Sequence, residues 1–356
     1  MERVTSGDIG GSLPVENVQA LAANKLLDNV PLRYIRPEYE HDQVVDDDSN
    51  HQIPVINLSK LVDDHEDELA KLHSACKHWG FFQLINHGVK EQVMDKIKKD
   101  MEEFFKLPLE EKLRYAKLRN SNEGYGQAFV HSEEQKLDWT DSLFLVPQPI
   151  YGRNLRFWPT TPSSFIETLE QFSSEVYAIS KTLLRMMAKN LGLESEKNLL
   201  NLFEEGRQGL RMGYYPPCVQ PKLVVGLTPH SDPTGLTLLL QVNDVQGLQI
   251  KKKGKWLPIK PIPDAFIINI GDIIEILSNG EYKSIEHRAV VNSEKERLSI
   301  AAFHGTNYKA MIGPLLELVK GHNRARYKTI ATFQEYLRKM LSCKLDGKNM
   351  LEELKL

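Results

Sequence analysis

The hydrophobic pattern of the N-terminal half predicts helices that alternate with short strands. Residues 53–58 and 81–88 are apolar runs bounded by turn-forming residues, which is typical of strands. Between these runs, apolar residues recur every three or four positions up to Trp79, and Gly80 follows as a C-terminal stop. The same spacing in residues 93–107 predicts a second helix. This half of the chain is therefore expected to mix both kinds of element.

The longest helical pattern spans residues 163–192. Ser164 and Glu167 have the spacing of an N-terminal capping box, and Gly192 stands where a helix would end. The apolar positions form one stripe, made by Phe165, Leu169, Phe172, Val176, Ile179, Leu183 and Met186. We expect this helix to bury its stripe against a sheet.

The pattern changes near residue 207. Short β-rich runs then follow one another about every ten residues, separated by Gly, Pro, Asn and Asp. Because most runs have no helix of crossover length between them, this spacing favours an all-β sandwich or barrel over parallel βαβ units. A final helix is predicted for 328–341, and the polar, acidic residues 40–52 resemble an exposed linker.

A titratable pair interrupts the apolar stretch LTPHSDPTGLTLLLQ at 227–241. His230 and Asp232 are two residues apart, so on a strand both side chains point to the same face. A second His-x-Asp pair, His65 and Asp67, lies in a charged run that opens a predicted helix, where such residues do not face each other. Burial without partners costs several kcal/mol, so the first pair must be paired, exposed to solvent or bound to something.

His287 is the expected third member of this site because it begins another predicted strand. Two histidines and one carboxylate form the facial triad of non-haem Fe(II) oxygenases, although Zn²⁺ would accept the same ligands. A core histidine bonded to a buried aspartate is the alternative explanation. If the strand register differs from our expectation, His304 replaces His287.

An inward-facing cation is predicted ten residues after His287. Arg297 and Ser299 open an otherwise apolar strand and project from the same face. A guanidinium in this position needs an anion, which is either an internal carboxylate or a small carboxylic acid bound beside a metal. One of the adjacent residues Tyr214 and Tyr215 also faces inward and can offer its phenol to the same ligand.

Composition limits the range of functions. The chain has 356 residues, 41% hydrophobic and 26% charged, and a formal net charge of −3. This charge gives no field for binding nucleic acid or an anionic membrane, and no segment has the length of an apolar membrane span. Three scattered cysteines indicate a reducing compartment. We expect a cytoplasmic monomer that acts on a small molecule.

Several short motifs of the sequence resemble those of the plant 2-oxoglutarate- and Fe(II)-dependent dioxygenases. These are PHSD, the distal EHR, RLSIAAFH, YYPPC, GLQI and NIGD in the C-terminal half, and EGYGQAF and ACKHWGFFQLINHGV in the N-terminal half. The resemblance runs from about residue 10 to the C-terminus, so it covers nearly the whole chain. SLPVENVQALA and EEQKLDWTD are most similar to the branch with alkaloid O-demethylases and norcoclaurine-synthase-like proteins.

This resemblance implies a fold and a set of roles. The fold is α+β with a mainly β core, a double-stranded β-helix (jelly roll) with flanking helices and a mixed N-terminal region. His230, Asp232 and His287 are implied as Fe(II) ligands and catalytic residues, with Arg297, Ser299 and Tyr215 at 2-oxoglutarate. O2 is the oxidant, and ascorbate is expected to support turnover.

The implied reaction oxidises a C–H bond of a lipophilic plant specialised metabolite, an alkaloid or a phenylpropanoid-derived compound, by hydroxylation or O-demethylation. The pocket residues implied by position are Phe303, Phe129, Ser142, Phe144 and Arg211; for Phe129 and Phe144, plain core packing is an equal alternative. Gly213 stands where the family commonly has Asn, which suggests a roomier pocket or looser cosubstrate binding.

Two other functions compete with oxidation. One is a non-oxidative condensing enzyme, resembling norcoclaurine synthase, on the same fold; the other is a metabolite-binding protein with a vestigial site. The complete triad and the Arg297–Ser299 pair favour the oxidative enzyme. The chain is expected to divide into an N-terminal arm and linker (1–50), an N-terminal dioxygenase region (51–160), a support helix and connection (161–204), the jelly-roll core (205–310) and a C-terminal helical segment (311–356).

Overall fold

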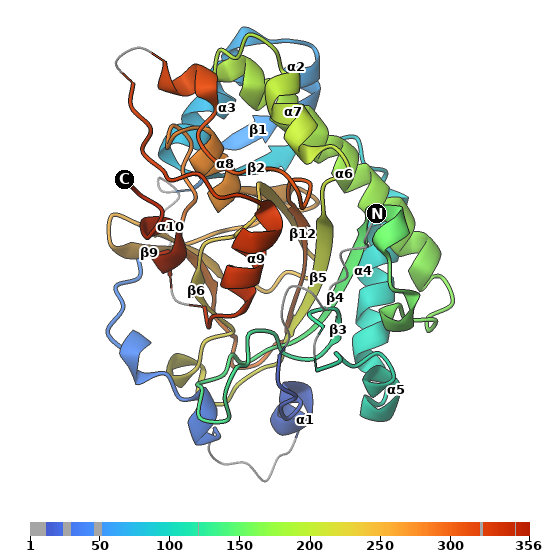
Figure 1. Cartoon of the computed structure of the whole chain (residues 1–356). Coiled ribbons are helices and arrows are strands. Elements are labelled where there is room, and N and C mark those ends of the chain that lie inside the picture. The colour runs from blue at the N-terminus through green and yellow to red at the C-terminus, as the bar shows by residue number, and fades with distance from the viewer. Residues whose placement is uncertain (1–11, 24–29, 46–51, 120, 321–322, 346) are drawn as a thin grey trace.

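Two β-sheets form the centre of the molecule, as a computed structural model shows (Figure 1). The structure describes residues 12–23, 30–45, 52–119, 121–320, 323–345 and 347–356. The larger sheet has eight strands in the order β1 (Val55–Asn57), β2 (Phe81–Ile85), β10 (Phe266–Ile270), β7 (Leu236–Gln241), β12 (Arg297–His304), β5 (Gln208–Tyr215), β4 (Asp141–Gln148) and β3 (Gly124–Tyr125). The smaller sheet has four, in the order β6 (Leu227–His230), β11 (His287–Ala289), β8 (Leu248–Lys252) and β9 (Lys255–Pro258). The predicted jelly roll is confirmed.

One face of the large sheet, called the inner face here, looks toward the small sheet and carries the predicted cosubstrate residues and most of the predicted pocket residues. Ser299 on β12 pairs with Gly213 on β5 and with Gln241 on β7, so these three residues share a face. Because side chains alternate along a strand, every second residue of each strand joins them. On this inner face lie Arg297, Ser299, Phe303, Arg211, Gly213, Tyr215, Ser142 and Phe144.

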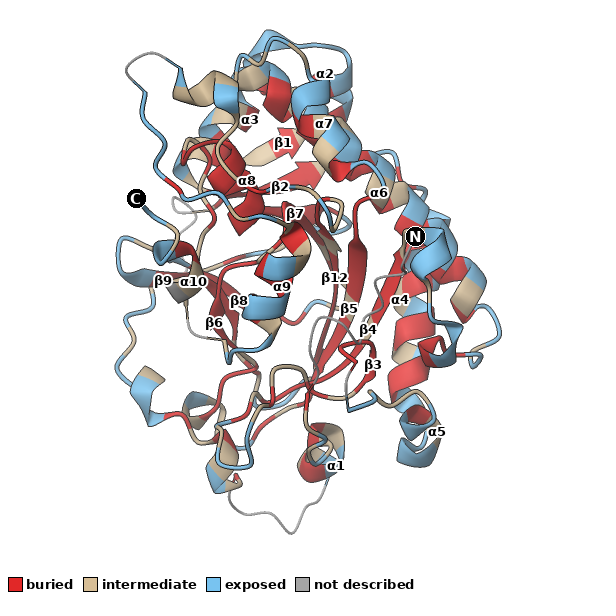
Figure 2. Cartoon of the chain, viewed as in Figure 1, coloured by how far each residue is buried: buried red, intermediate tan, exposed pale blue. Residues whose placement is uncertain are grey.

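The opposite face of the large sheet is covered by helices. The long helix α6 (Phe165–Asn190) crosses it and buries the predicted apolar stripe, except for the half-buried Met186 (Figure 2). Its Ser173 donates to the side chain of Gln208 at the start of β5, at 2.5 Å. Helix α4 (Glu91–Lys106) packs beside α6. The remaining helices are α1 (Val18–Ala23), α2 (Leu58–Val62), α3 (Glu66–His78), α5 (Leu109–Leu113), α7 (Lys197–Phe203), α8 (Asp272–Leu277), α9 (Phe333–Leu341) and α10 (Asn349–Glu352).

Some predicted element ends, and one predicted cap, differ from the structure. The last long helix begins at Phe333, not at 328, because the Thr332 side chain accepts from the Glu335 amide and caps it there. The strand that begins at Phe81 ends at Ile85, since the backbone turns in the left-handed region directly afterwards. Ser164 does not cap α6, because its hydroxyl donates to Asp100 at 2.7 Å.

The C-terminal segment returns to β6 and lies beside its last residue, His230. The Gly347 amide donates to the carbonyl of Pro229, and the Ser231 amide donates to the carbonyl of Gly347, at 2.9 and 3.2 Å. The Lys348 ammonium forms an ion pair with Glu275 in α8. Part of the predicted 40–52 linker, residues 46–51, lies outside the described residues. Within the described ranges, no helix is both long and apolar enough to cross a bilayer.

Candidate active site

Three predicted ligands meet between the two sheets. His230 ends β6 and His287 begins β11, and the two residues are direct cross-strand partners. Asp232 follows β6, and its Oδ1 lies 3.5 Å from His230 Nε2 and 3.6 Å from His287 Nε2. One ligand atom from each residue lies within 4.8 Å of the other two. The predicted grouping of these residues is therefore confirmed.

Hydrogen bonds hold each ligand with one atom free for a cation. The Nδ1 atoms of His230 and His287 lie 2.8 and 3.1 Å from the carbonyls of Thr228 and Ile285. A carbonyl only accepts, so Nδ1 carries the proton in both rings, and the lone pair of each Nε2 faces Asp232. Such outer contacts fix the tautomer that a metal needs.

Asp232 is oriented by two residues of the large sheet. Its Oδ2 accepts from Thr237 on β7 at 2.5 Å and from Asn269 on β10 at 2.7 Å, which leaves Oδ1 toward the histidines. Sequence reasoning missed both residues. The signal was a lone polar side chain within each apolar run, LTLLLQ and FIINI.

The electrostatics suit a divalent cation. Burial alone would raise the pKa of Asp232, but His287, His230 and the Thr237 hydroxyl lower it, so the carboxylate is ionised. Burial and the neighbouring His230 lower the pKa of His287 to about 4, so its imidazole is neutral near pH 7. A neutral imidazole pair with one carboxylate is a donor set that Fe(II) accepts.

Arg297 is buried on the inner face without an acidic partner. The residue is 1% exposed, and its Nη1 and Nη2 donate to Ser299 and Gln241 at 3.3 and 3.0 Å. Nε has no hydrogen-bond partner, and no carboxylate among the described residues forms an ion pair with this guanidinium. The alternative of an internal salt bridge therefore has no acidic partner for Arg297 among the residues that the structure describes. The sequence pointed to Arg297 and Ser299 but not to Gln241.

Tyr215 lies between two guanidinium groups. The Arg297 guanidinium is 5.1 Å from the Tyr215 ring centre, and Arg211 Nη1 donates to the Tyr215 hydroxyl at 2.8 Å. Burial would raise the pKa of Tyr215, but Arg211 and Arg297 together lower it below its ordinary value. Tyr214 points the other way, stacks on Phe105 and donates to Glu296.

The sequence suggested that Gly213 makes the pocket roomier, but the structure shows no extra space beside this residue. A Cβ at this position would lie 2.7 Å from Arg211 Nη1 and 3.1 Å from the Tyr215 hydroxyl oxygen. The Arg211 side chain fills this space, and the absence of a side chain at 213 is what lets it contact Tyr215.

The predicted pocket residues divide into two places. Phe303 and Phe144 lie on the inner face with ring centres 6.5 Å apart, and Ser142 is nearby with its hydroxyl bonded to the Gly126 carbonyl. Phe129 is elsewhere, on the wall of a separate cavity. His304 faces the helical side of the sheet, beside Gln208 at 3.0 Å, so it cannot replace His287.

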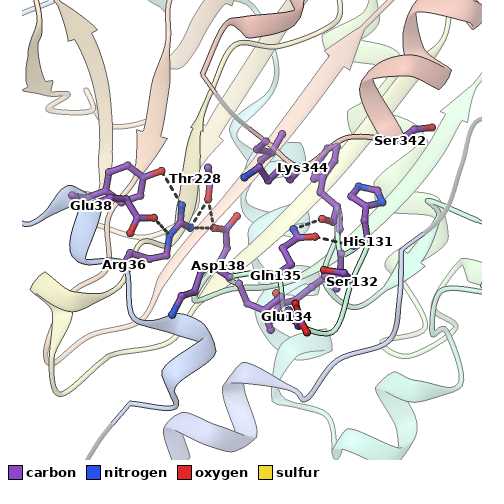
Figure 3. A pocket seen from close by; sticks show the side chains of 18 residues that line it. Arg36, Glu38, His131, Ser132, Glu134, Gln135, Asp138, Thr228, Ser342 and Lys344 are labelled. Atoms are coloured by element: carbon purple, nitrogen blue, oxygen red, sulfur yellow. Dashed lines mark hydrogen bonds and ion pairs between the residues drawn. The ribbon is translucent and has the colours of Figure 1, made fainter.

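Two cavities lie near the C-terminal segment. The larger cavity has a volume of about 730 Å³ (Figure 3). The residues that line it include Arg36, Asp138, Thr228, His131, Gln135 and Lys344. The smaller, of about 390 Å³, is bordered by His230 and by residues from Met340 to Glu353. Lys344 and Leu345 line both cavities, so this part of the C-terminal segment is a shared wall of the two.

Known proteins share this sequence and arrangement. Residues 53–161 match the family model of the N-terminal region of the non-haem dioxygenase in morphine synthesis, and residues 206–306 match that of the 2OG-Fe(II) oxygenase superfamily. The chain is 58% identical to S-norcoclaurine synthase 1 of Coptis japonica and 46% identical to codeine O-demethylase of Papaver somniferum, covering 98% of each chain in both comparisons.

A solved structure extends the likeness to the fold. The crystal structure of JOX2 in complex with 2OG, Fe, and JA has 39% identity and a TM-score of 0.89, with 97% of this chain and 98% of that chain covered. The triad geometry agrees with the Fe(II) of that family. The chain therefore belongs to the 2OG-Fe(II) oxygenase superfamily and is a 2-oxoglutarate-dependent dioxygenase.

Proposed function

We propose that His230, Asp232 and His287 hold Fe(II) and that Arg297 and Ser299 bind the distal carboxylate of 2-oxoglutarate. The observation that carries this proposal is the buried Arg297 guanidinium, which has hydrogen-bond partners in Ser299 and Gln241 but no carboxylate among the described residues. A dicarboxylate that chelates a metal at one end supplies the missing anion at the other.

The residues of this chain position the reactants. When bound, Fe(II) supplies the oxidation chemistry, in which 2-oxoglutarate and O2 become succinate and CO2 while a substrate C–H bond is oxidised. Thr237 and Asn269 hold Asp232 in the orientation that binds the cation. The Tyr215 ring packs against the Arg297 guanidinium and holds it in place. The Phe144 and Phe303 rings on the inner face exclude water.

The organic substrate is proposed to be a lipophilic plant specialised metabolite, an alkaloid or a phenylpropanoid-derived compound. Phe144 and Phe303 offer two apolar rings, inclined at 41° to each other, on the inner face of the large sheet. The similarity to codeine O-demethylase supports O-demethylation, which begins with hydroxylation of the methoxy carbon. Hydroxylation of another C–H bond uses the same site.

A condensing activity is the second candidate, because S-norcoclaurine synthase 1 is a relative with 58% identity. Condensation of an amine with an aldehyde needs no carboxylate cosubstrate. Arg297, buried and unpaired with any described carboxylate, therefore favours oxidation. Product formation without 2-oxoglutarate and without succinate release would support condensation instead.

We also propose that the protein acts as a cytoplasmic monomer, with the five segments given above as its organisation. Three free cysteines and a net charge of −3 support a reducing compartment and no membrane partner. Sedimentation velocity at micromolar concentration is expected to give a single species near the chain mass of 40.7 kDa. A concentration-independent species of twice that mass contradicts the monomer.

The direct test of function is an anaerobic titration. Fe(II) followed by 2-oxoglutarate is expected to give a metal-to-ligand charge-transfer band in the parent protein. His230→Ala removes the band because a ligand is lost, and Arg297→Ala raises the 2-oxoglutarate concentration needed by about 10- to 100-fold, since a charge-assisted hydrogen bond is lost. Arg185→Ala, on the exposed face of α6, is the control with no change. A folded parent protein that shows no band contradicts the proposal.

The residues behind Asp232 should set the metal affinity. Thr237→Val and Asn269→Ala each remove one hydrogen bond to Oδ2 of Asp232, so the carboxylate can turn away from the histidines. We expect Fe(II) affinity to fall about 10- to 100-fold, as for other residues that orient metal ligands. Anaerobic calorimetry measures this, with the exposed Thr182→Val as the control. Affinity equal to that of the control variant means that Asp232 is held by other contacts.

Gly213 should affect the cosubstrate through Arg211. Gly213→Asn places side-chain atoms where Arg211 Nη1 now lies and separates Arg211 from Tyr215. The loss of that hydrogen bond is expected to weaken 2-oxoglutarate binding about twofold to tenfold. The control is Gly254→Asn, at a position with open space and a φ of +79° that Asn tolerates. Unchanged or tighter binding in Gly213→Asn would show that Arg211 does not act through Tyr215.

A further inference from the structure

A second inner-face arginine lacks an anion. Arg207 immediately precedes β5 and is 6% exposed. Its Nε has no hydrogen-bond partner, and no carboxylate among the described residues forms an ion pair with it. None of the functions proposed above uses this residue.

The position of the guanidinium is well defined by an aromatic ring and a glycine. Its carbon lies 5.2 Å from the centre of the Phe144 ring, which neighbours Phe303. A Cβ at Gly209 would lie 2.6 Å from the Phe144 ring and 3.1 Å from Arg207 Nη1. Because Gly209 pairs with Phe303, the guanidinium is on the inner face, and Gly209 provides the space for both groups.

Two other buried arginines, Arg288 and Arg36, are compensated by acidic partners. Arg288, 5% exposed, pairs with Asp42 and donates to Gln249, and Arg36, 7% exposed, pairs with Glu38 and Asp138. A guanidinium keeps its charge at any physiological pH, so burial without an anion costs several kcal/mol. Arg207 and Arg297 share this deficit, and for Arg297 a cosubstrate carboxylate removes it.

The strand spacing between Thr237, a partner of Asp232, and Gly209, beside Arg207, fits a small organic molecule. Asn269, Thr237, Phe303 and Gly209 form one row across four neighbouring strands, β10, β7, β12 and β5. Asn269 and Thr237 bond Asp232 at one end of this row, and Arg207 lies beside Gly209 at the other. Two strand intervals separate Thr237 from Gly209, roughly 10 Å. The rings of Phe303 and Phe144 lie along this path.

We propose that Arg207 binds a carboxylate of the organic substrate, whose ring system packs on Phe144 and Phe303 with its reacting carbon toward the triad. This inference rests on the proposed function and specifies its substrate class as an aromatic or alicyclic carboxylic acid. The inner faces of β5 and β12, with Arg207, carry three guanidinium groups and no carboxylate. That balance favours an organic anion over a protonated amine.

The test measures binding of acids and their neutral counterparts. The protein is loaded anaerobically with Fe(II) and saturating 2-oxoglutarate, and cinnamate, phenylacetate and 2-naphthoate are titrated by calorimetry beside their primary amides. At least one acid is expected to bind the parent protein about 10-fold or more tightly than its amide. Arg207→Met should abolish that preference and Arg207→Lys should retain part of it. Arg185→Met, an exposed site on α6, should leave it intact.

Two further readouts separate the possible failures. The charge-transfer band should be equally strong in the parent protein and in Arg207→Met, because Arg207 does not contact 2-oxoglutarate in this account. If the parent protein itself shows no band, the proposed function is contradicted and not this inference. Removing an uncompensated buried cation should leave the melting temperature of Arg207→Met equal to or above that of the parent. If no acid is preferred over its amide while the band is present, or if Arg207→Met melts lower and keeps the preference, Arg207 is a structural residue and the inference is wrong.

Discussion

The carboxylate of Asp232 connects the two sheets of the jelly roll at the candidate metal site. One oxygen is held by Thr237 and Asn269 from the large sheet, and the other faces His230 and His287 from the small sheet. A buried carboxylate is costly without partners. The two sheets must therefore lie in the relative position that brings Thr237 and Asn269 to one oxygen of Asp232 and the two histidines to the other. The same arrangement leaves three ligand atoms directed at one point.

Alternation along the strands extends that constraint over the inner face. Residues of β5 and β12 that share the face with Ser299 include the guanidinium groups of Arg211 and Arg297, and Arg207 continues the series. Arg211 is satisfied by Tyr215, whereas Arg207 and Arg297 have no carboxylate among the described residues. Two buried cations of the inner face that lack a carboxylate among the described residues are consistent with two bound anions, one for the cosubstrate and one for the substrate.

Sequence patterns were sufficient for those features that depend on local spacing. The i, i+2 spacing of His230 with Asp232 and of Arg297 with Ser299 places each pair on one face of a strand, and the apolar stripe of α6 predicts its packing. The partners of Asp232 could not be assigned from spacing, since Thr237 and Asn269 are brought together only by the pairing of β7 with β10. The roomier pocket expected at Gly213 is not found, because the adjacent space is filled by the Arg211 side chain, which the sequence pattern could not place.

The most direct measurement of the central claim is a crystal structure of the protein grown anaerobically with Fe(II) and 2-oxoglutarate. We predict one iron bound by His230 Nε2, Asp232 Oδ1 and His287 Nε2, with the distal carboxylate of 2-oxoglutarate on Arg297 and Ser299. Iron at another position, or 2-oxoglutarate with its distal carboxylate away from Arg297, would contradict this account of the site.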